Sequence, residues 1–122
     1  MSIEIIGQNQ IRIEASKFGM RLWRNNSGVL NDTKGRPVRF GLGNDSKAVN
    51  ARLKSGDLIG IYQGRFVSVE VKASDWRYTG NDRELAQKTW INLIRENGGI
   101  ACFACDWNDV LECIKTGKNR HD

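Results

Sequence analysis

The chain has 122 residues, a length that fits one domain, and 39% of them are hydrophobic and 27% charged, as in ordinary globular proteins. No apolar run approaches the ~18 residues that a membrane-spanning helix needs, and the first residues lack the pattern of a signal peptide. We therefore expect no membrane partner and a cytoplasmic location. The net charge of +5, from 19 basic and 14 acidic residues, favours an anionic partner.

The first elements are predicted from the spacing of apolar residues. Residues 4–18 predict a helix, because their apolar side chains can form one stripe at helical spacing. Residues 20–24 predict a short strand, because apolar and polar side chains alternate there. Two more short apolar segments, 29–30 and 38–40, could pair across the polar turn between them.

The centre of the chain predicts a β-hairpin. Residues 57–62 and 65–72 have the composition of strands, and Gln63-Gly64 between them suits a two-residue turn. The second strand alternates strictly, so its valines share one face and its charged residues the other. This hairpin is the best-defined part of the predicted fold.

The second half of the chain alternates helix and strand. A helix is predicted over residues 81–97, a buried strand over 100–105 and a last helix over 106–117. The order α-β-β-β-α-β-α predicts an α/β fold with a central mixed sheet flanked by helices. We expect one domain over residues 1–117, followed by a tail at 118–122.

Most of the positive charge lies in one polar segment, residues 31–56. It contains six basic residues against two acidic ones, is rich in Gly and Asn, and is poor in apolar residues. Such a basic loop favours polyanions, because contacts with phosphate groups release bound counterions. A solvated surface loop would have the same composition, so charge alone leaves both readings open. The basic residues are Lys34, Arg36, Arg39, Lys47, Arg52 and Lys54.

The predicted hairpin brings two carboxylates together. If the two-residue turn pairs Tyr62 with Arg65, the register continues down the strands until Asp57 faces Glu70. Neighbouring carboxylates repel each other unless a cation lies between them, and their oxygen atoms suit Mg²⁺ or Mn²⁺. The backbone carbonyl of Val71 could add a ligand, and Lys72 lies on the same face as Glu70. The alternative is a set of surface charges on an edge strand.

Three cysteines lie close together near the end of the chain: Cys102, Cys105 and Cys113. Their odd number and clustering favour free thiols in a reducing compartment over a disulfide framework. The pair Cys102-x-x-Cys105 could form half of a zinc site, but a structural site needs four ligands. Only Cys113 and the single histidine, His121, remain as candidates, so small buried side chains in a strand are the favoured interpretation.

Three stretches of the sequence resemble a known nuclease family. Ser55-Gly56-Asp57, followed after twelve residues by Glu70-Val71-Lys72, resembles the PD-(D/E)XK signature, with Gly56 in place of the usual proline. Residues 84–90 resemble the Q-x-x-W helix of the small VRR-NUC nucleases, which occur mainly in phages and bacteria. Residues 21–28 are similar to that family's "lwRnnxG" stretch. The resemblance covers about residues 4–110.

The resemblance implies a restriction-endonuclease-like fold and a metal-dependent DNA endonuclease that uses Mg²⁺ or Mn²⁺. It assigns Asp57 and Glu70 to the metal and Lys72 to catalysis, and it places Gln87 beside the site. The family also has an acidic residue on its first helix. Here that residue could be Glu4 or Glu14, and Glu4 is favoured because Glu4-x-x-x-Gln8 resembles the family's helix start.

The expected partner is DNA, in the cytoplasm of a bacterial or phage-infected cell. The small size of the chain and the family analogy favour a homodimer that recognises branched DNA by its shape. Two alternatives remain: an accessory protein that binds DNA without cutting it, and a metal-dependent hydrolase of a small phosphorylated substrate. The residues expected to contact DNA are Arg24, Asn26, Arg39, Lys47, Arg52, Lys54 and Arg77.

Overall fold

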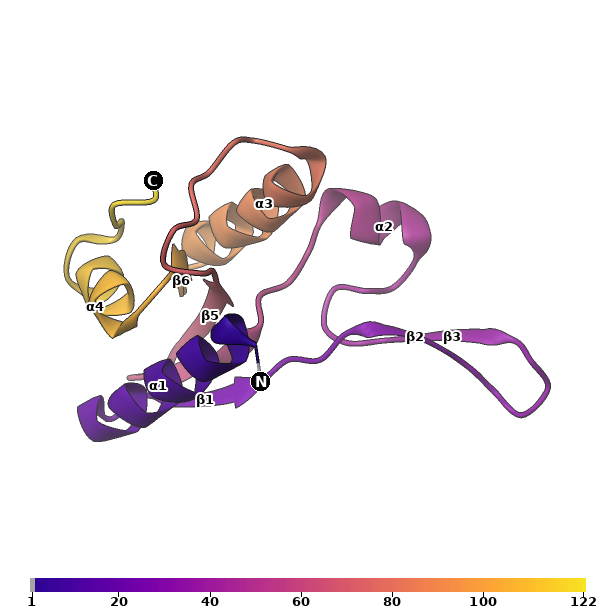
Figure 1. Ribbon diagram of the computed structural model, residues 1–122, viewed down its shortest axis with the longest axis horizontal. Helices are drawn as coiled ribbons and strands as arrows, with labels where there is room; N and C mark the ends of the chain where they lie inside the picture. The colour runs from indigo at the N-terminus through magenta and orange to yellow at the C-terminus, as the bar shows by residue number, and fades with distance from the viewer. Residues whose placement is uncertain (1) are drawn as a thin grey trace.

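A computed structural model describes residues 2–122, and in it helices alternate with short strands (Figure 1). In chain order the elements are α1 (Ile3–Phe18), β1 (Arg21–Arg24), β2 (Gly28–Asn31), β3 (Pro37–Phe40), α2 (Lys47–Arg52), β4 (Leu58–Tyr62), β5 (Arg65–Val71), α3 (Asp82–Glu96), β6 (Ile100–Ala104) and α4 (Trp107–Thr116). Among residues 2–122, no helix has the length and apolar character needed to cross a membrane.

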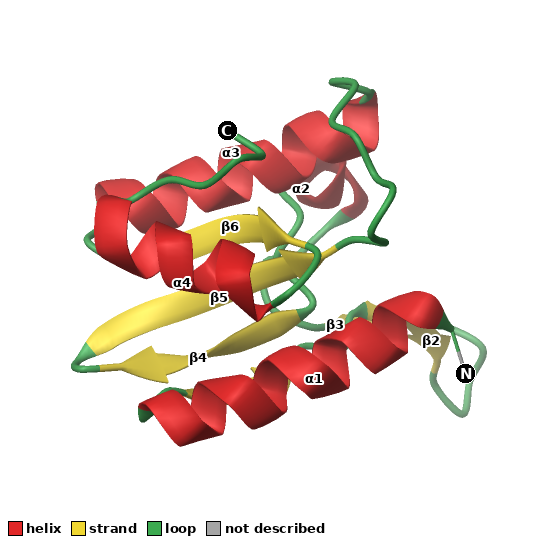
Figure 2. Cartoon of the chain, turned by 60° about the vertical axis from the view of Figure 1, so that its left-hand side comes forward, coloured by secondary structure: helices red, strands yellow, loops and turns green. Residues whose placement is uncertain are grey.

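The central sheet has four strands in the order β1-β4-β5-β6. The β1–β4 and β4–β5 pairs are antiparallel and the β5–β6 pair is parallel, so the sheet is mixed. Helices α1 and α4 cover one face, where they share an apolar core with the sheet, and α3 covers the other (Figure 2). The predicted α/β class, with a mixed sheet flanked by helices, is confirmed.

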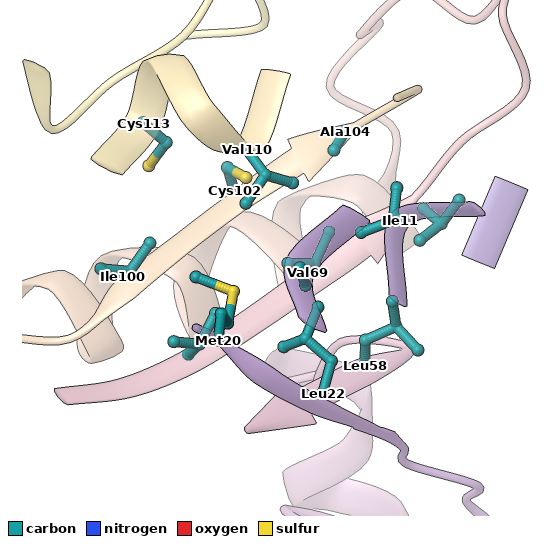
Figure 3. Packing of buried hydrophobic residues seen from close by; sticks show 13 residues of the cluster. Ile11, Met20, Leu22, Leu58, Val69, Ile100, Cys102, Ala104, Val110 and Cys113 are labelled. Carbon is teal, nitrogen blue, oxygen red and sulfur yellow. The ribbon is translucent and has the colours of Figure 1, made fainter. Parts of the chain in front are cut away.

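The core between the sheet and helices α1 and α4 consists of aliphatic and sulfur-containing side chains (Figure 3). Ile11 from α1 and Val110 from α4 are fully buried against Val69 of β5. Successive side chains of β5 point to opposite faces of the sheet. Because its valines are buried against α1 and α4, Glu70 points to the face that α3 covers. The core therefore fixes the direction in which Glu70 points.

The predicted hairpin register is confirmed from Leu58↔Val69 to Tyr62↔Arg65. The two loop residues, Gln63 and Gly64, have φ angles of 48° and 77°, which is the left-handed backbone that such a tight turn requires. A shift of one position would move every side chain to the opposite face. The turn thus sets which residues meet at the far end of the hairpin.

The segment expected as a long basic loop contains more structure than predicted. Residues 28–40 form a two-stranded ribbon that projects from the domain, as the two apolar segments suggested (Figure 1). The short helix α2 was missed. It has no buried residue and therefore no apolar periodicity, and it begins where the side chain of Ser46 accepts a hydrogen bond from the N–H of Val49.

Residues 118–122, expected as a tail, pack against the domain. Asn119 is buried, and its side-chain amide donates to the carbonyl oxygens of Phe103 and Asp109. Asp122 accepts hydrogen bonds from Arg95 and Lys88 on α3. These contacts are polar and join residues that are far apart in the sequence, so no apolar pattern could predict them.

Gly60 lies where two backbones approach closely, opposite Leu22 in the β1–β4 pair. A Cβ atom at this position would collide with the carbonyl oxygen of Arg21. We expect Gly60→Ala to lower the free energy of unfolding by about 1–3 kcal/mol or more, as measured by urea denaturation. Gly7→Ala is the matched control, because a Cβ there has room within α1 and helix propensity favours Ala. Equal stability of the two variants would contradict this prediction.

Candidate functional site

The two carboxylates predicted to meet are neighbours in the structure. Asp57 directly precedes β4, and Glu70 lies in β5 across the hairpin. The backbone N–H of Asp57 donates to Glu70 Oε2 over 3.1 Å, and the N–H of Val71 donates to Asp57 Oδ2 over 2.8 Å. Each carboxylate is therefore anchored to the backbone of the opposite strand. Glu70 is buried and Asp57 is half-buried.

The proximity and burial of these groups favour their neutral forms. Burial raises the pKa of Glu70 to about 8, together with the negative charge of Asp57, although Lys72 and Arg83 partly oppose the shift. Burial also raises the pKa of Asp57, against the opposing effect of the hydrogen bond from the Val71 N–H. A positive charge near their oxygen atoms would therefore stabilise the ionised forms of both carboxylates.

Lys72 and Gln87 complete a chain of polar contacts to Glu70. Lys72 Nζ donates to Gln87 Oε1 over 3.0 Å, and Gln87 Nε2 donates to Glu70 Oε1 over 2.8 Å. Lys72 Nζ also lies 3.9 Å from Glu70 Oε1. The sequence-predicted residues Asp57, Glu70, Lys72 and Gln87 thus converge from β5, α3 and the start of β4.

Aromatic rings support the Lys72 ammonium group. Lys72 Nζ lies 5.2 Å from the centre of the Trp76 ring and 5.7 Å from that of Phe103. Both distances fall within the range of a cation–π interaction. Trp76 packs against Phe103 inside the fold. These rings restrict the positions that the ammonium group can take.

Glu84 fixes the loop that carries Trp76, a role that the sequence did not predict. Its Oε2 accepts from Trp76 Nε1 over 2.9 Å, while its Oε1 accepts from Thr79 and from the N–H of Gly80. Burial opposes ionisation of Glu84, but these hydrogen bonds lower its pKa to about 2. Glu84 is therefore a charged support for the loop beside Lys72.

Of the two candidate acids on the first helix, Glu4 lies nearer to Asp57 than Glu14 does. The start of α1 lies against the end of β5, since a Cβ on Gly7 would be 3.4 Å from the Val71 side chain. The charge of Glu4 is among the influences that raise the pKa of Asp57. Glu14 lies more than two turns further along α1 and forms an ion pair with Lys17 at 3.2 Å. The structure thus brings the favoured of the two candidate acids toward the carboxylate pair.

The donor set suits a divalent cation that prefers oxygen ligands. Asp57 and Glu70 supply carboxylate oxygens, and Val71, whose N–H binds Asp57, is the residue whose carbonyl was expected as a further ligand. Two adjacent carboxylates with raised pKa values are stabilised as anions when a cation replaces the bound proton. The residues present therefore fit Mg²⁺ or Mn²⁺.

A cavity of about 270 Å³ opens over the carboxylates, and basic side chains line it. Arg39 and Lys54, two of the predicted DNA-binding residues, contribute to this lining. Arg83, which was not among the predicted residues, lines it too. Its position could have been found, because Arg83 and Gln87 are four residues apart and share one face of α3. Burial and the charges of Arg83 and Arg39 lower the pKa of Lys54, which shows how closely these cations are placed.

The other predicted DNA-binding residues lie outside this cavity lining. Arg24 donates to Asn9 Oδ1 over 3.2 Å, and Arg77 donates to the carbonyl oxygen of Trp76. Asn26, Lys47 and Arg52 are exposed, the last two on α2. Their side chains are available to solvent and do not converge on the carboxylates.

Asn25, the residue directly after β1, supports the site. Its side-chain amide donates to Ser55 Oγ over 2.8 Å and to the carbonyl oxygen of Gly56 over 2.9 Å. Its backbone N–H donates to the carbonyl of Asp57 over 2.8 Å. Gly56 is tightly enclosed, since a Cβ there would lie 2.7 Å from Ser68 Oγ. This position shapes the backbone that presents Asp57.

Comparison of the sequence with models of known protein families and with curated proteins gave no match. Function is therefore inferred from the residues of the site. They combine two adjacent carboxylates with a lysine that Gln87 links to Glu70 by hydrogen bonds. The cavity above them is lined by three further basic side chains. Such an arrangement can hold a divalent cation next to a bound anion.

Proposed function

We propose that the chain is a metal-dependent DNA endonuclease of the PD-(D/E)XK type, similar to the small VRR-NUC nucleases. The observation that carries this proposal is the placement of Asp57, Glu70 and Lys72 around one point, with Gln87 bridging the last two. The mixed four-stranded sheet, with α1 and α4 on one face and α3 on the other, supports a restriction-endonuclease-like core. Glu70 lies near the end of β5, and Lys72 is the residue directly after the strand.

Asp57 and Glu70 would hold Mg²⁺ or Mn²⁺, with the Val71 carbonyl and Glu4 as further ligands. A bound divalent cation supplies Lewis-acid stabilisation of the negative charge on a phosphate undergoing hydrolysis. The protein's own contribution begins with Lys72, whose ammonium group stabilises charge on the phosphate and can exchange a proton with the attacking water. Gln87 positions this ammonium group relative to Glu70.

The basic lining of the cavity supports a nucleic-acid substrate. Arg39, Lys54 and Arg83 would bind phosphate groups that flank the scissile bond, because each is a cation facing the same cavity. The exposed Arg24, Asn26, Lys47, Arg52 and Arg77 would extend these contacts along the DNA backbone. None of these contacts reads a base sequence, so we infer selection of branched DNA by shape. We infer a homodimer acting in the cytoplasm of a bacterial or phage-infected cell.

Cleavage of supercoiled plasmid and of a labelled four-way junction tests the proposal directly. We expect cutting with Mg²⁺ or Mn²⁺, none with EDTA, and loss of at least about 10²-fold in rate for Asp57→Asn. Asp75→Asn is the matched control, because Asp75 is an exposed acid in the loop after Lys72. Its rate should equal that of the natural chain.

The alternatives give different outcomes in the same assays. DNA binding that weakens steeply with salt, without cleavage under either metal, would replace the nuclease proposal with a non-cleaving DNA-binding protein. Turnover of small phosphorylated compounds that salt does not affect, without plasmid cleavage, would indicate a small-substrate hydrolase. Equal, symmetric nicks across the junction would support the dimer.

A further inference from the structure

A second group of metal-ligating side chains lies where α4 meets the end of the chain, apart from the Asp57–Glu70 pair. Cys105 follows β6, Asp109 lies in the first turn of α4, and His121 is the residue before the last. His121 Nε2 lies 2.9 Å from Asp109 Oδ2 and 3.7 Å from Cys105 Sγ. The three ligand atoms lie within 4.8 Å of one another, so they could contact one ion.

Surrounding contacts hold these three groups in place. Asp109 is 3% exposed; its Oδ1 accepts from Arg120 Nε over 2.7 Å, and its Oδ2 accepts from the Cys105 N–H over 2.8 Å. The backbone N–H of His121 donates to Asn119 Oδ1, and its ring lies 5.4 Å from the ring of Trp76. Metal ligands in proteins are commonly oriented by such outer hydrogen bonds and packing. The three groups therefore lie together in the metal-free chain, where Arg120 and His121 contact the Asp109 carboxylate.

We propose that Cys105, Asp109 and His121 bind a transition metal ion of the zinc class. A thiolate, an imidazole and a carboxylate together suit Zn²⁺, whereas Mg²⁺ prefers oxygen ligands alone. With Zn–S near ~2.3 Å and Zn–N near ~2.0 Å, a tetrahedral site separates sulfur and nitrogen by about 3.5 Å. The observed separation between Cys105 Sγ and His121 Nε2 is 3.7 Å. Three protein ligands leave a fourth position for solvent.

The same three residue types could instead form a nucleophilic thiol with a base, but the local charges oppose this reading. Burial and the negative charge of Asp109 raise the pKa of the Cys105 thiol, whereas a reactive cysteine needs a lowered pKa. When a metal ion binds, the thiol proton passes to solvent as the metal–sulfur bond forms. His121 Nε2 faces Asp109 Oδ2 over 2.9 Å, so a proton on Nε2 must also leave before this nitrogen can bind the metal, and the neutral ring then carries its proton on Nδ1.

The ion would link the end of the chain to the wall of the carboxylate site. Cys105 Sγ lies 3.3 Å from the carbonyl oxygen of Ala73, the residue after Lys72. His121 packs on Trp76, whose ring faces the Lys72 ammonium group. A metal at this cluster would therefore brace the last residues, β6 and the 73–80 loop against one another. Its role is structural and does not depend on DNA cleavage.

Titration of the reduced full-length chain with Co²⁺ tests this site. We expect one equivalent of Co²⁺ to produce a thiolate-to-cobalt charge-transfer band in the near ultraviolet, which Zn²⁺ then abolishes by displacing the cobalt. We also expect Zn²⁺ to raise the thermal unfolding midpoint. The Asp57–Glu70 site has no sulfur ligand, so it cannot produce this band. Absence of the band in the natural chain, with excess Co²⁺, would overturn the proposal.

Variants show which residues bind the cobalt ion that produces the charge-transfer band. Cys105→Ser and His121→Phe should each remove it, whereas Cys113→Ser and Asp57→Asn should retain it. If Cys105→Ser fails to fold, His121→Phe provides the same test, because an aromatic ring at this position can keep the packing against Trp76. A band that survives both Cys105→Ser and His121→Phe would belong to another cysteine and would overturn the proposal.

Discussion

Replacement of Lys72 by methionine is expected to lower the rate of the proposed metal-dependent DNA cleavage by about 10²- to 10³-fold, the usual cost of removing one preorganised group that stabilises charge in a transition state. Methionine keeps an unbranched stem beside Trp76 and Phe103 but removes the ammonium group that contacts Gln87. The loss should therefore fall on the chemical step. Single-turnover cleavage at saturating protein concentration measures that step separately from binding.

Two further variants make this prediction specific. Lys115→Met removes an exposed lysine in the last turn of α4 and should leave the rate unchanged. Lys72→Arg keeps the positive charge, but its planar guanidinium cannot reproduce the compact ammonium contact, so we expect only partial activity. DNA affinity should change little in both Lys72 variants. A single-turnover rate of Lys72→Met equal to that of the natural chain would remove Lys72 from the proposed mechanism.

The contacts within the hairpin were predictable because they are local. A two-residue turn determines the pairing of every residue that follows, so the sequence alone placed Asp57 beside Glu70. The strict alternation of valines in β5 then fixed the face that Glu70 occupies. Neither step required knowledge of how the rest of the chain packs. The turn and the strand pattern could not predict that Gln87 lies beside these residues. That position was predicted only from the resemblance to the nuclease family.

Contacts between distant segments were the part that sequence reasoning missed. Arg83 enters the cavity because α3 crosses the face of the sheet that carries Glu70, and only its spacing from Gln87 on that helix could have indicated this position. The approach of His121 to Cys105 spans the whole of α4, and the sequence offered Cys102 as the more obvious metal partner. Cys102 is instead buried in the core with Cys113. Polar contacts of this kind lack the periodicity that reveals an apolar core.

Glu70→Gln is expected to change how the stability of the protein depends on pH. The pKa of Glu70 is raised from its ordinary value of 4.5 to about 8, so the folded chain retains a proton between these pH values that the unfolded chain releases. The free energy of unfolding should therefore fall as the pH rises through this range, by roughly 1 kcal/mol for each pH unit, and below it the effect should be absent. Asp57, whose pKa is also raised, acts in the same direction.

Urea denaturation at a series of pH values in EDTA measures this decline. The Glu70→Gln variant lacks the ionising group, so its stability should fall less between about pH 5 and pH 8 than that of the natural chain. Glu112→Gln, an exposed acid on α4, should keep the natural slope. Mg²⁺ or Mn²⁺ should restore stability to the natural chain mainly at high pH, because the cation then replaces the proton between Asp57 and Glu70. Identical slopes for the natural chain and Glu70→Gln would show that the carboxylate of Glu70 ionises freely, and the argument for a cation at this pair would fail.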